Sequence, residues 1–120
     1  MDLEELRNYC LVKPGVTASF PFGETTLVFK VLDKVFALVA LDDSPLSINL
    51  KCDPEVAIEL RERYGSVLPG YHMNKKYWNT VLLDGSIRSD LIRKWIDTSY
   101  GLVLAGLPKG KRLALARNSP

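Results

Sequence analysis

The stretch from residue 26 to residue 51, TLVFKVLDKVFALVALDDSPLSINLK, decides the fold. In residues 26–31 and 46–51, large apolar side chains recur at every second position, which predicts half-buried β-strands. Residues 35–41 are apolar almost without a break and predict a central strand. Only short turns, 32–34 and 42–45, separate these strands. Such connections require antiparallel pairing, because parallel strands need long crossovers.

Helical segments lie on both sides of this stretch. Asp2 is a predicted N-cap for a short first helix. Asp53 followed by Pro54 predicts the start of a second helix, with Asp as the cap and Pro at the first helical position. Residues 88–105 carry an apolar stripe that indicates a third helix. Trp95 belongs to this stripe, so we expect it in the core, where replacement by Ala would cost about 3–5 kcal/mol.

These elements predict an α+β domain in which an antiparallel β-sheet carries its helices on one face. The helices cover the apolar face of the sheet. An antiparallel sheet can leave its second face in water, and this open face is either merely solvated or a binding surface. The polar residues expected on it are Thr26, Lys30, Ser47, Asn49 and Lys51.

Length and composition limit the function classes. The chain has 120 residues, which suits one domain, and its formal net charge is only +2. A charge this small does not drive a protein onto nucleic acid, so any anion-binding role needs a local patch. The sequence shows no secretory signal and no membrane span, and Cys10 and Cys52 are expected to be reduced structural thiols. We therefore expect a cytoplasmic protein that does not contact membranes.

Residues 69–81, PGYHMNKKYWNTV, form the segment richest in chemically versatile side chains. It holds the single histidine, two adjacent lysines and three aromatic residues. The lysines could contact phosphates, the aromatic rings could stack on bases, and the amides could read a base edge or fix a turn. The alternative is a structural loop leading into a core strand. The candidate binding residues of this segment are Tyr71, His72, Asn74, Lys75, Lys76, Trp78 and Asn79.

Trp78 has two possible environments in the strand predicted over residues 76–83. Alternation places Asn79 on the core side and Trp78 on the open face, beside Lys30, Asn49 and Lys51. Leu82 shares the side of Trp78 and argues instead for burial. The sequence leaves both environments open.

The motif in this segment resembles the MmcQ/YjbR family of small bacterial proteins, over roughly residues 1–110. The resemblance implies a two-layer fold like that of CyaY and frataxin. It implies no enzyme activity, and it brings the family's label of DNA binding. Residues 111–120 lie outside it and are expected to form a basic tail that is either ordered or disordered. The matching residues are Pro69-Gly70-Tyr71-His72-Met73-Asn74-Lys75-Lys76 and Trp78-Asn79-Thr80-Val81, supported by Pro21-Phe22-Gly23, Leu50-Lys51-Cys52, Pro54, Ser99-Tyr100 and Leu107-Pro108-Lys109.

No catalytic or metal site is predicted. His72 has no second His, Cys or carboxylate near it in sequence, so we expect it to form a hydrogen bond that positions the loop. The acidic clusters at residues 2–5 and 42–43 are short, unlike the acidic ridge of iron-binding frataxins. No phosphate loop or zinc-ligand spacing is present, and no cofactor is expected.

Three function classes remain. The leading hypothesis is a non-enzymatic binding module whose partner is DNA, bound weakly and in a salt-sensitive manner, or a protein that docks on the open face. The second is a small-ligand or enzymatic site around Tyr71, His72, Asn74 and Lys75. The third is a frataxin-like metal-delivery protein. Lys30, Asn49, Lys51, Lys76 and Trp78 on one exposed surface would support the first hypothesis.

Overall fold

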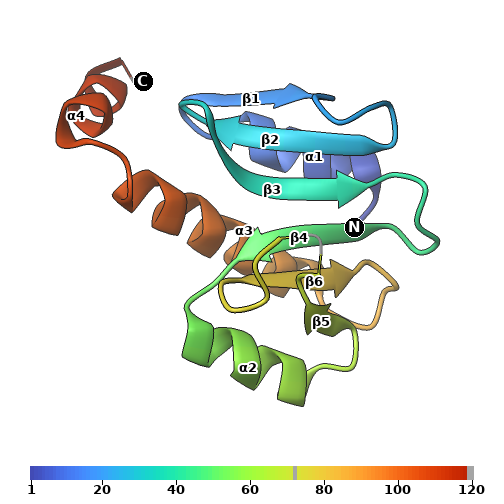
Figure 1. Ribbon diagram of the computed structural model, residues 1–120. Coiled ribbons are helices and arrows are strands. Elements are labelled where there is room, and N and C mark those ends of the chain that lie inside the picture. The colour runs from blue at the N-terminus through green and yellow to red at the C-terminus, as the bar shows by residue number, and fades with distance from the viewer. Residues whose placement is uncertain (72, 119–120) are drawn as a thin grey trace.

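The computed structural model describes residues 1–71 and 73–118, and it consists of a sheet with a layer of helices (Figure 1). All strand pairs are antiparallel, and the strand order is β1-β2-β3-β4-β6-β5. The predicted α+β class and antiparallel sheet are therefore confirmed. The elements are α1 (Leu3–Leu11), β1 (Val16–Ser19), β2 (Thr26–Val31), β3 (Lys34–Ala40), β4 (Ser47–Lys51), α2 (Pro54–Arg63), β5 (Val67–Pro69), β6 (Trp78–Leu82), α3 (Ser89–Ala105) and α4 (Lys109–Asn118).

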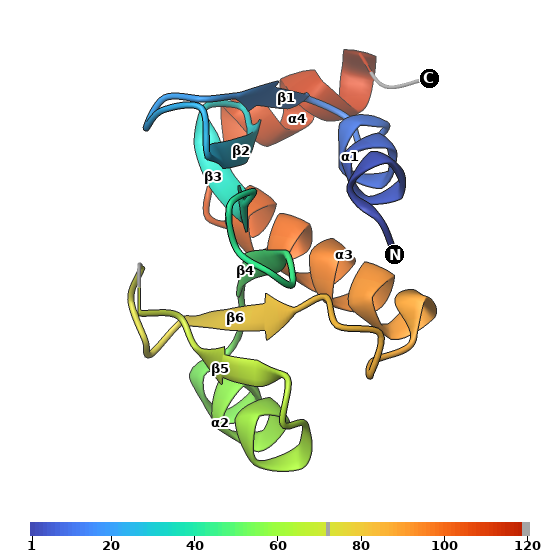
Figure 2. The same cartoon turned by 90° about the vertical axis from the view of Figure 1, so that its right-hand side faces the viewer.

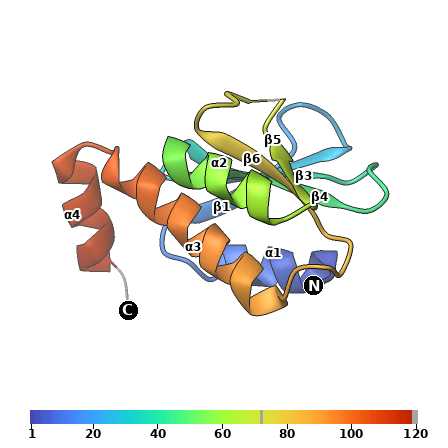
Figure 3. The same ribbon diagram turned by 90° about the horizontal axis from the view of Figure 1, so that it is seen from below.

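The helices α1, α2 and α3 cover the same face of the sheet, as predicted (Figures 2 and 3). Between this face and the helices lies the main core, which contains Phe29, Phe36 and Ile48 from the strands and Leu6 and Ile96 from α1 and α3. All five are fully buried. The period of two in residues 26–31 and 46–51 thus identified the core-facing side of β2 and β4.

Both predicted N-caps are confirmed. One carboxylate oxygen of Asp2 accepts a hydrogen bond from the backbone N–H of Glu5 at 2.8 Å. At α2, the Asp53 carboxylate accepts from the N–H of Glu55 at 3.1 Å, and Pro54 occupies the first helical position. These bonds satisfy backbone donors that have no partner within the helix.

The second face of the sheet is partly covered, whereas the sequence predicted that it is open to solvent. Val28, Leu38 and Trp78 form a second buried cluster there, and Met73 packs against it. Trp78 lies on this second face, as alternation predicted, and it is also buried, as its neighbour Leu82 suggested, with only 8 % exposed. Asn49 is also buried, with 4 % exposed. Alternation placed these side chains on the correct side, but it could not show that the loop before β6 covers them.

Trp95 is less buried than we expected. It packs against the main core but remains partly accessible. Its ring meets the ring of Tyr64 edge-on, with the centroids 5.4 Å apart. Because the indole is only partly removed from water, the cost of Trp95→Ala should fall below the range of about 3–5 kcal/mol expected for a fully buried aromatic residue.

The region expected to be a C-terminal tail is largely helical. The helix α4 runs over Lys109–Asn118, so the predicted domain end at residue 110 falls inside it. Leu115 packs against the main core, which explains why the segment is ordered. This helix contains four basic and no acidic residues. The rest of the chain has 12 basic and 14 acidic residues, so its net charge is negative.

Ser99 of α3 joins the helical layer to the middle of the sheet. Its hydroxyl donates a hydrogen bond to the carbonyl oxygen of Phe36 at 2.6 Å and accepts one from the N–H of Lys51 at 2.8 Å. Phe36 is the extra residue on β3 where the β2–β3 register shifts, and its carbonyl lies just beyond the last β3–β4 pair, Ala37 and Leu50. The Ser99 hydroxyl therefore bridges the Phe36 carbonyl and the Lys51 N–H at the point where direct β3–β4 pairing has ended.

Replacing Ser99 by Ala should lower the free energy of unfolding by about 2–4 kcal/mol, because a backbone acceptor and a donor, each worth about 1–3 kcal/mol when buried and unpaired, both lose their partner. Urea denaturation followed by circular dichroism measures the difference. Thr98→Ala is the matched control, since that exposed hydroxyl bonds only to the Lys94 carbonyl within α3. Equal losses for the two variants would contradict the bridging role.

Candidate functional site

The loop over residues 70–77, called here the 70–77 loop, is closed at its base by a close backbone contact. The N–H of Gly70 donates to the carbonyl oxygen of Trp78 at 2.9 Å. A Cβ at position 70 would lie 2.7 Å from both the Cβ and the carbonyl oxygen of Trp78. Only glycine allows the two ends of the loop to approach this closely.

Asn74 shapes the turn within this loop. Its side-chain oxygen accepts from the N–H of Lys76 at 2.8 Å, and its carbonyl oxygen accepts from the N–H of Trp78 at 2.9 Å. Met73 packs against the second cluster beneath the loop. The structure therefore gives Asn74 a turn-forming role, which was one of the two alternatives for the amides of this segment.

Four of the exposed side chains of the 70–77 loop pair as cation and aromatic ring. Tyr71 is 64 % exposed and Tyr77 is 38 % exposed. The ammonium nitrogen of Lys75 lies 5.1 Å from the Tyr71 ring centroid, and that of Lys76 lies 5.5 Å from the Tyr77 centroid. These distances are within the range of cation–π contacts. The loop thus presents two positive charges and two ring systems to solvent.

The remaining predicted site residues do not join this surface. Asn49 is buried, and its side-chain oxygen accepts from the Thr80 hydroxyl at 2.6 Å. Asn79 faces the helical layer, as alternation predicted, and its amide nitrogen donates to the Ala57 carbonyl oxygen at 3.2 Å. The single exposed surface predicted for Lys30, Asn49, Lys51, Lys76 and Trp78 is therefore not formed. The predicted role of His72 lies outside the described residues.

Two hollows lie on opposite faces of the sheet. The open-face groove has a volume of about 500 Å³, and Leu38, Asn49 and Met73 are among the residues that line it. Two carboxylates, Asp42 and Asp43, also line it, together with Phe22, Thr25, Thr26 and Ala40.

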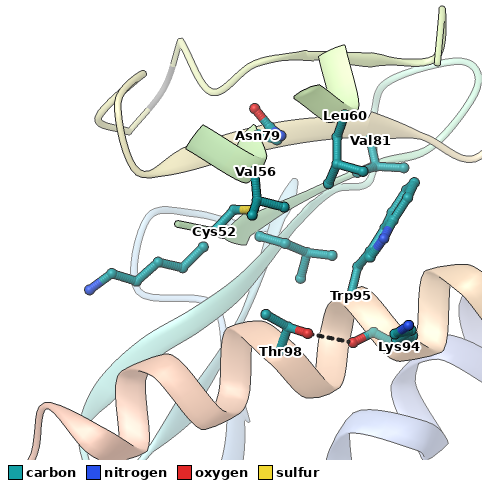
Figure 4. Close-up of a pocket in the computed structure, with 10 residues that line it drawn as sticks. Cys52, Val56, Leu60, Asn79, Val81, Lys94, Trp95 and Thr98 are labelled. Atoms are coloured by element: carbon teal, nitrogen blue, oxygen red, sulfur yellow. Dashed lines mark hydrogen bonds between the residues drawn. The ribbon is translucent and has the colours of Figure 1, made fainter. Parts of the chain in front are cut away.

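The second hollow, called here the α2–α3 groove, has a volume of about 210 Å³ and lies between α2 and α3 (Figure 4). Burial raises the pKa of the Cys52 thiol in its wall, so this thiol is neutral at physiological pH. The residues lining it are Leu50, Lys51, Cys52, Val56, Leu60, Asn79, Val81, Lys94, Trp95 and Thr98.

Comparison with known proteins places this chain among relatives with the same fold. The model of the YjbR family matches residues 11–102. The chain belongs to the YjbR family. The uncharacterized protein YjbR of Escherichia coli K12 is 37% identical over 117 residues, which cover 98% of this chain and 99% of that protein. The uncharacterized protein YbdF of Escherichia coli O157:H7 is 39% identical over 106 residues, covering 88% of this chain and 87% of YbdF.

Solved structures agree with this YjbR assignment. The crystal structure of Deinococcus radiodurans DR2400 superposes with a TM-score of 0.89 at 42% identity, covering 95% of this chain and 87% of that chain. A Pseudomonas syringae protein superposes with a TM-score of 0.75 at 28% identity, covering 86% and 99%.

Sequence reasoning missed several residues of these sites. Tyr77 was assigned to the core side because the strand was predicted from residue 76, but β6 begins at Trp78 and Tyr77 belongs to the loop. Val56 and Leu60 lie on one face of α2 and both line the α2–α3 groove; Leu60 also packs against the main core, whereas Val56 stays exposed. No sequence signal distinguishes an apolar stripe that contacts another element from one that faces a gap.

Two structural searches of the described chain bear on other function classes. Within residues 1–71 and 73–118, no group of three His, Cys, Asp or Glu side chains is placed to hold a metal ion. None of the described helices combines the length and apolar character that a membrane crossing requires.

Replacing Gly70 by Ala should lower the free energy of unfolding by about 1–3 kcal/mol, because the new Cβ clashes with backbone that cannot move without breaking the Gly70–Trp78 hydrogen bond. Thermal denaturation measures the loss. Gly101→Ala in α3 is the control: its Cβ would meet nothing within 4 Å. That change should instead stabilise the protein by about 0.5–1 kcal/mol. A neutral Gly70→Ala change would show that the base of the loop is not held by this contact.

Proposed function

We propose that this YjbR-family protein is a non-enzymatic nucleic-acid-binding module that uses the 70–77 loop, with DNA as the polymer that the family resemblance implies. The observation that supports the proposal best is the exposure of Tyr71, Lys75, Lys76 and Tyr77 on one short, anchored loop. Lysines supply phosphate contacts, and exposed tyrosines supply stacking faces for bases.

Charge around the loop favours a polyanion. No acidic residue occurs between residues 63 and 83. Arg61 of α2 lies close to the loop, since its guanidinium donates to the Lys75 carbonyl oxygen at 3.5 Å. The loop is therefore a local basic site on a chain whose net charge is only +2.

Anchoring of the loop also supports binding. The Gly70–Trp78 bond, the Asn74 turn and the packing of Met73 hold the backbone before any ligand arrives. A preorganised loop loses less conformational entropy on binding. Because only a few phosphates can contact so small a surface, we expect weak, salt-sensitive binding.

A salt titration of binding to a fluorescent single-stranded oligonucleotide tests this function. Lys76→Gln should lower the log–log slope of affinity against salt by about 0.7, the value for one lost phosphate contact on a single strand. Tyr71→Ala should leave the slope unchanged and weaken binding by about 1–3 kcal/mol, the worth of one stacked base. Together the two variants separate charge from stacking.

Arg112→Gln in α4 is the matched charge control, since this exposed residue belongs to the basic helix outside the loop. Its slope should equal that of the unmodified protein. If Arg112→Gln and Lys76→Gln lower the slope equally, binding is a property of the overall basic surface and the loop is not the site. Absence of binding at low salt would end the nucleic-acid proposal.

The open-face groove supports a second candidate, a protein partner on the sheet in the manner of frataxin-like proteins. Asp42 and Asp43 line the groove beside Leu38 and Met73. Carboxylates repel a polyanion but suit a basic and apolar segment of a protein. Asp42→Asn would weaken binding of such a partner and would strengthen, or leave unchanged, binding of the oligonucleotide.

A further inference from the structure

We propose that the α2–α3 groove binds a small organic anion with an apolar body, of the aromatic carboxylate class. The groove lies in the helical layer, whereas the 70–77 loop packs on the other face of the sheet through Met73. The inference therefore does not depend on nucleic-acid binding.

The groove exists because the helices do not close over the sheet between α2 and α3. Val56 and Leu60 of α2 face Trp95 and Thr98 of α3 across it (Figure 4). Val56 remains 43 % exposed although it belongs to the apolar stripe of its helix. An apolar side chain that reaches no partner leaves apolar surface for a ligand to cover.

Apolar side chains make up most of the groove. Leu50 and Val81 from the sheet lie among its lining residues, with the Trp95 indole at one side. Its volume of about 210 Å³ can be compared with a cavity of roughly 150 Å³, which accommodates benzene. A single ring with a short substituent is therefore the size of ligand expected.

Charge selects an anion. Lys94 of α3 lines the groove, and no acidic residue does. Lys51 also borders the groove, but it pairs with Trp78 across β4 and β6, which places its side chain on the second face of the sheet. Neither lysine belongs to any of the three salt bridges formed by the described residues, Lys13–Asp97, Arg88–Asp90 and Arg93–Glu5. A carboxylate beside the Lys94 ammonium would form charge-assisted hydrogen bonds at the edge of an apolar surface.

Among the other polar groups of the groove, the buried side-chain oxygen of Asn79 has no hydrogen-bond partner within the described residues, but it is an acceptor and cannot bind a carboxylate. The Thr98 hydroxyl donates to the Lys94 carbonyl oxygen at 3.0 Å, and the Asn79 amide nitrogen donates to the Ala57 carbonyl oxygen. Cys52 is buried. The Lys94 ammonium is therefore the donor left to orient an anionic head, with the ring directed inward.

Titration of the ¹⁵N-labelled full chain with phenylacetate, followed by NMR, tests the inference. The chain has two tryptophans, so two indole N–H signals are expected, and Trp95→Phe assigns one of them. Phenylacetate at millimolar concentrations should shift the Trp95 signal and leave the buried Trp78 signal in place. Phenylacetamide, which has the same shape without the charge, should bind at least about fivefold more weakly, because charge-assisted hydrogen bonds are lost.

Lysine variants test which ammonium group contacts the carboxylate of the ligand. Lys94→Gln should raise the dissociation constant for phenylacetate roughly fivefold or more, since one such contact is lost. Lys109→Gln, an exposed lysine at the start of α4, should leave it unchanged. The inference is overturned if phenylacetate leaves the Trp95 signal unmoved, if the acid and the amide bind equally, or if Lys109→Gln weakens binding as much as Lys94→Gln.

Discussion

The hydroxyl of Ser99 is the contact on which the arrangement of sheet and helices depends. It bonds to backbone groups of β3 and β4 at the point where their direct pairing stops. The carbonyl belongs to Phe36, which is fully buried, and the N–H to Lys51, which is partly buried; a peptide group removed from water without a partner is costly. The register shift at Phe29/Lys30 leaves Phe36 as an extra residue on β3, and α3 supplies the polar group that pairs with its carbonyl. The same two hydrogen bonds hold α3 across the central strands, where Ile96 and Val103 of this helix pack in the main core.

The N-terminal helix is held to α3 by a second set of polar contacts. The Tyr9 hydroxyl donates to the Asp97 carboxylate at 2.7 Å, and Lys13 forms a salt bridge with the same carboxylate. The Tyr100 hydroxyl donates to the Pro14 carbonyl oxygen at 2.6 Å. No comparable set joins α2 to α3 among the hydrogen bonds and salt bridges of the described residues, and the α2–α3 groove lies between these two helices.

The two faces of the sheet differ in electrostatic character and therefore in the ligands that suit them. On one face, the 70–77 loop carries Lys75 and Lys76, while Asp42 and Asp43 line the groove next to Met73. On the helical face, Lys94 lines an apolar groove. A small net charge thus hides local regions of opposite sign, and local charge rather than total charge determines which anions or cations bind.

The sequence by itself determined the strand directions, the helix caps and the core-facing residues of β2 and β4. These features depend on neighbours within a few positions, through turn length, capping hydrogen bonds and alternation. Only the tertiary structure decided that Trp78 and Asn49 are buried, because that depends on the loop closed by Gly70 and on Met73 packing beneath it. Likewise, the apolar stripe of α2 is plain in the sequence, but whether it meets α3 or faces a gap depends on how two helices distant in sequence are placed by the sheet beneath them.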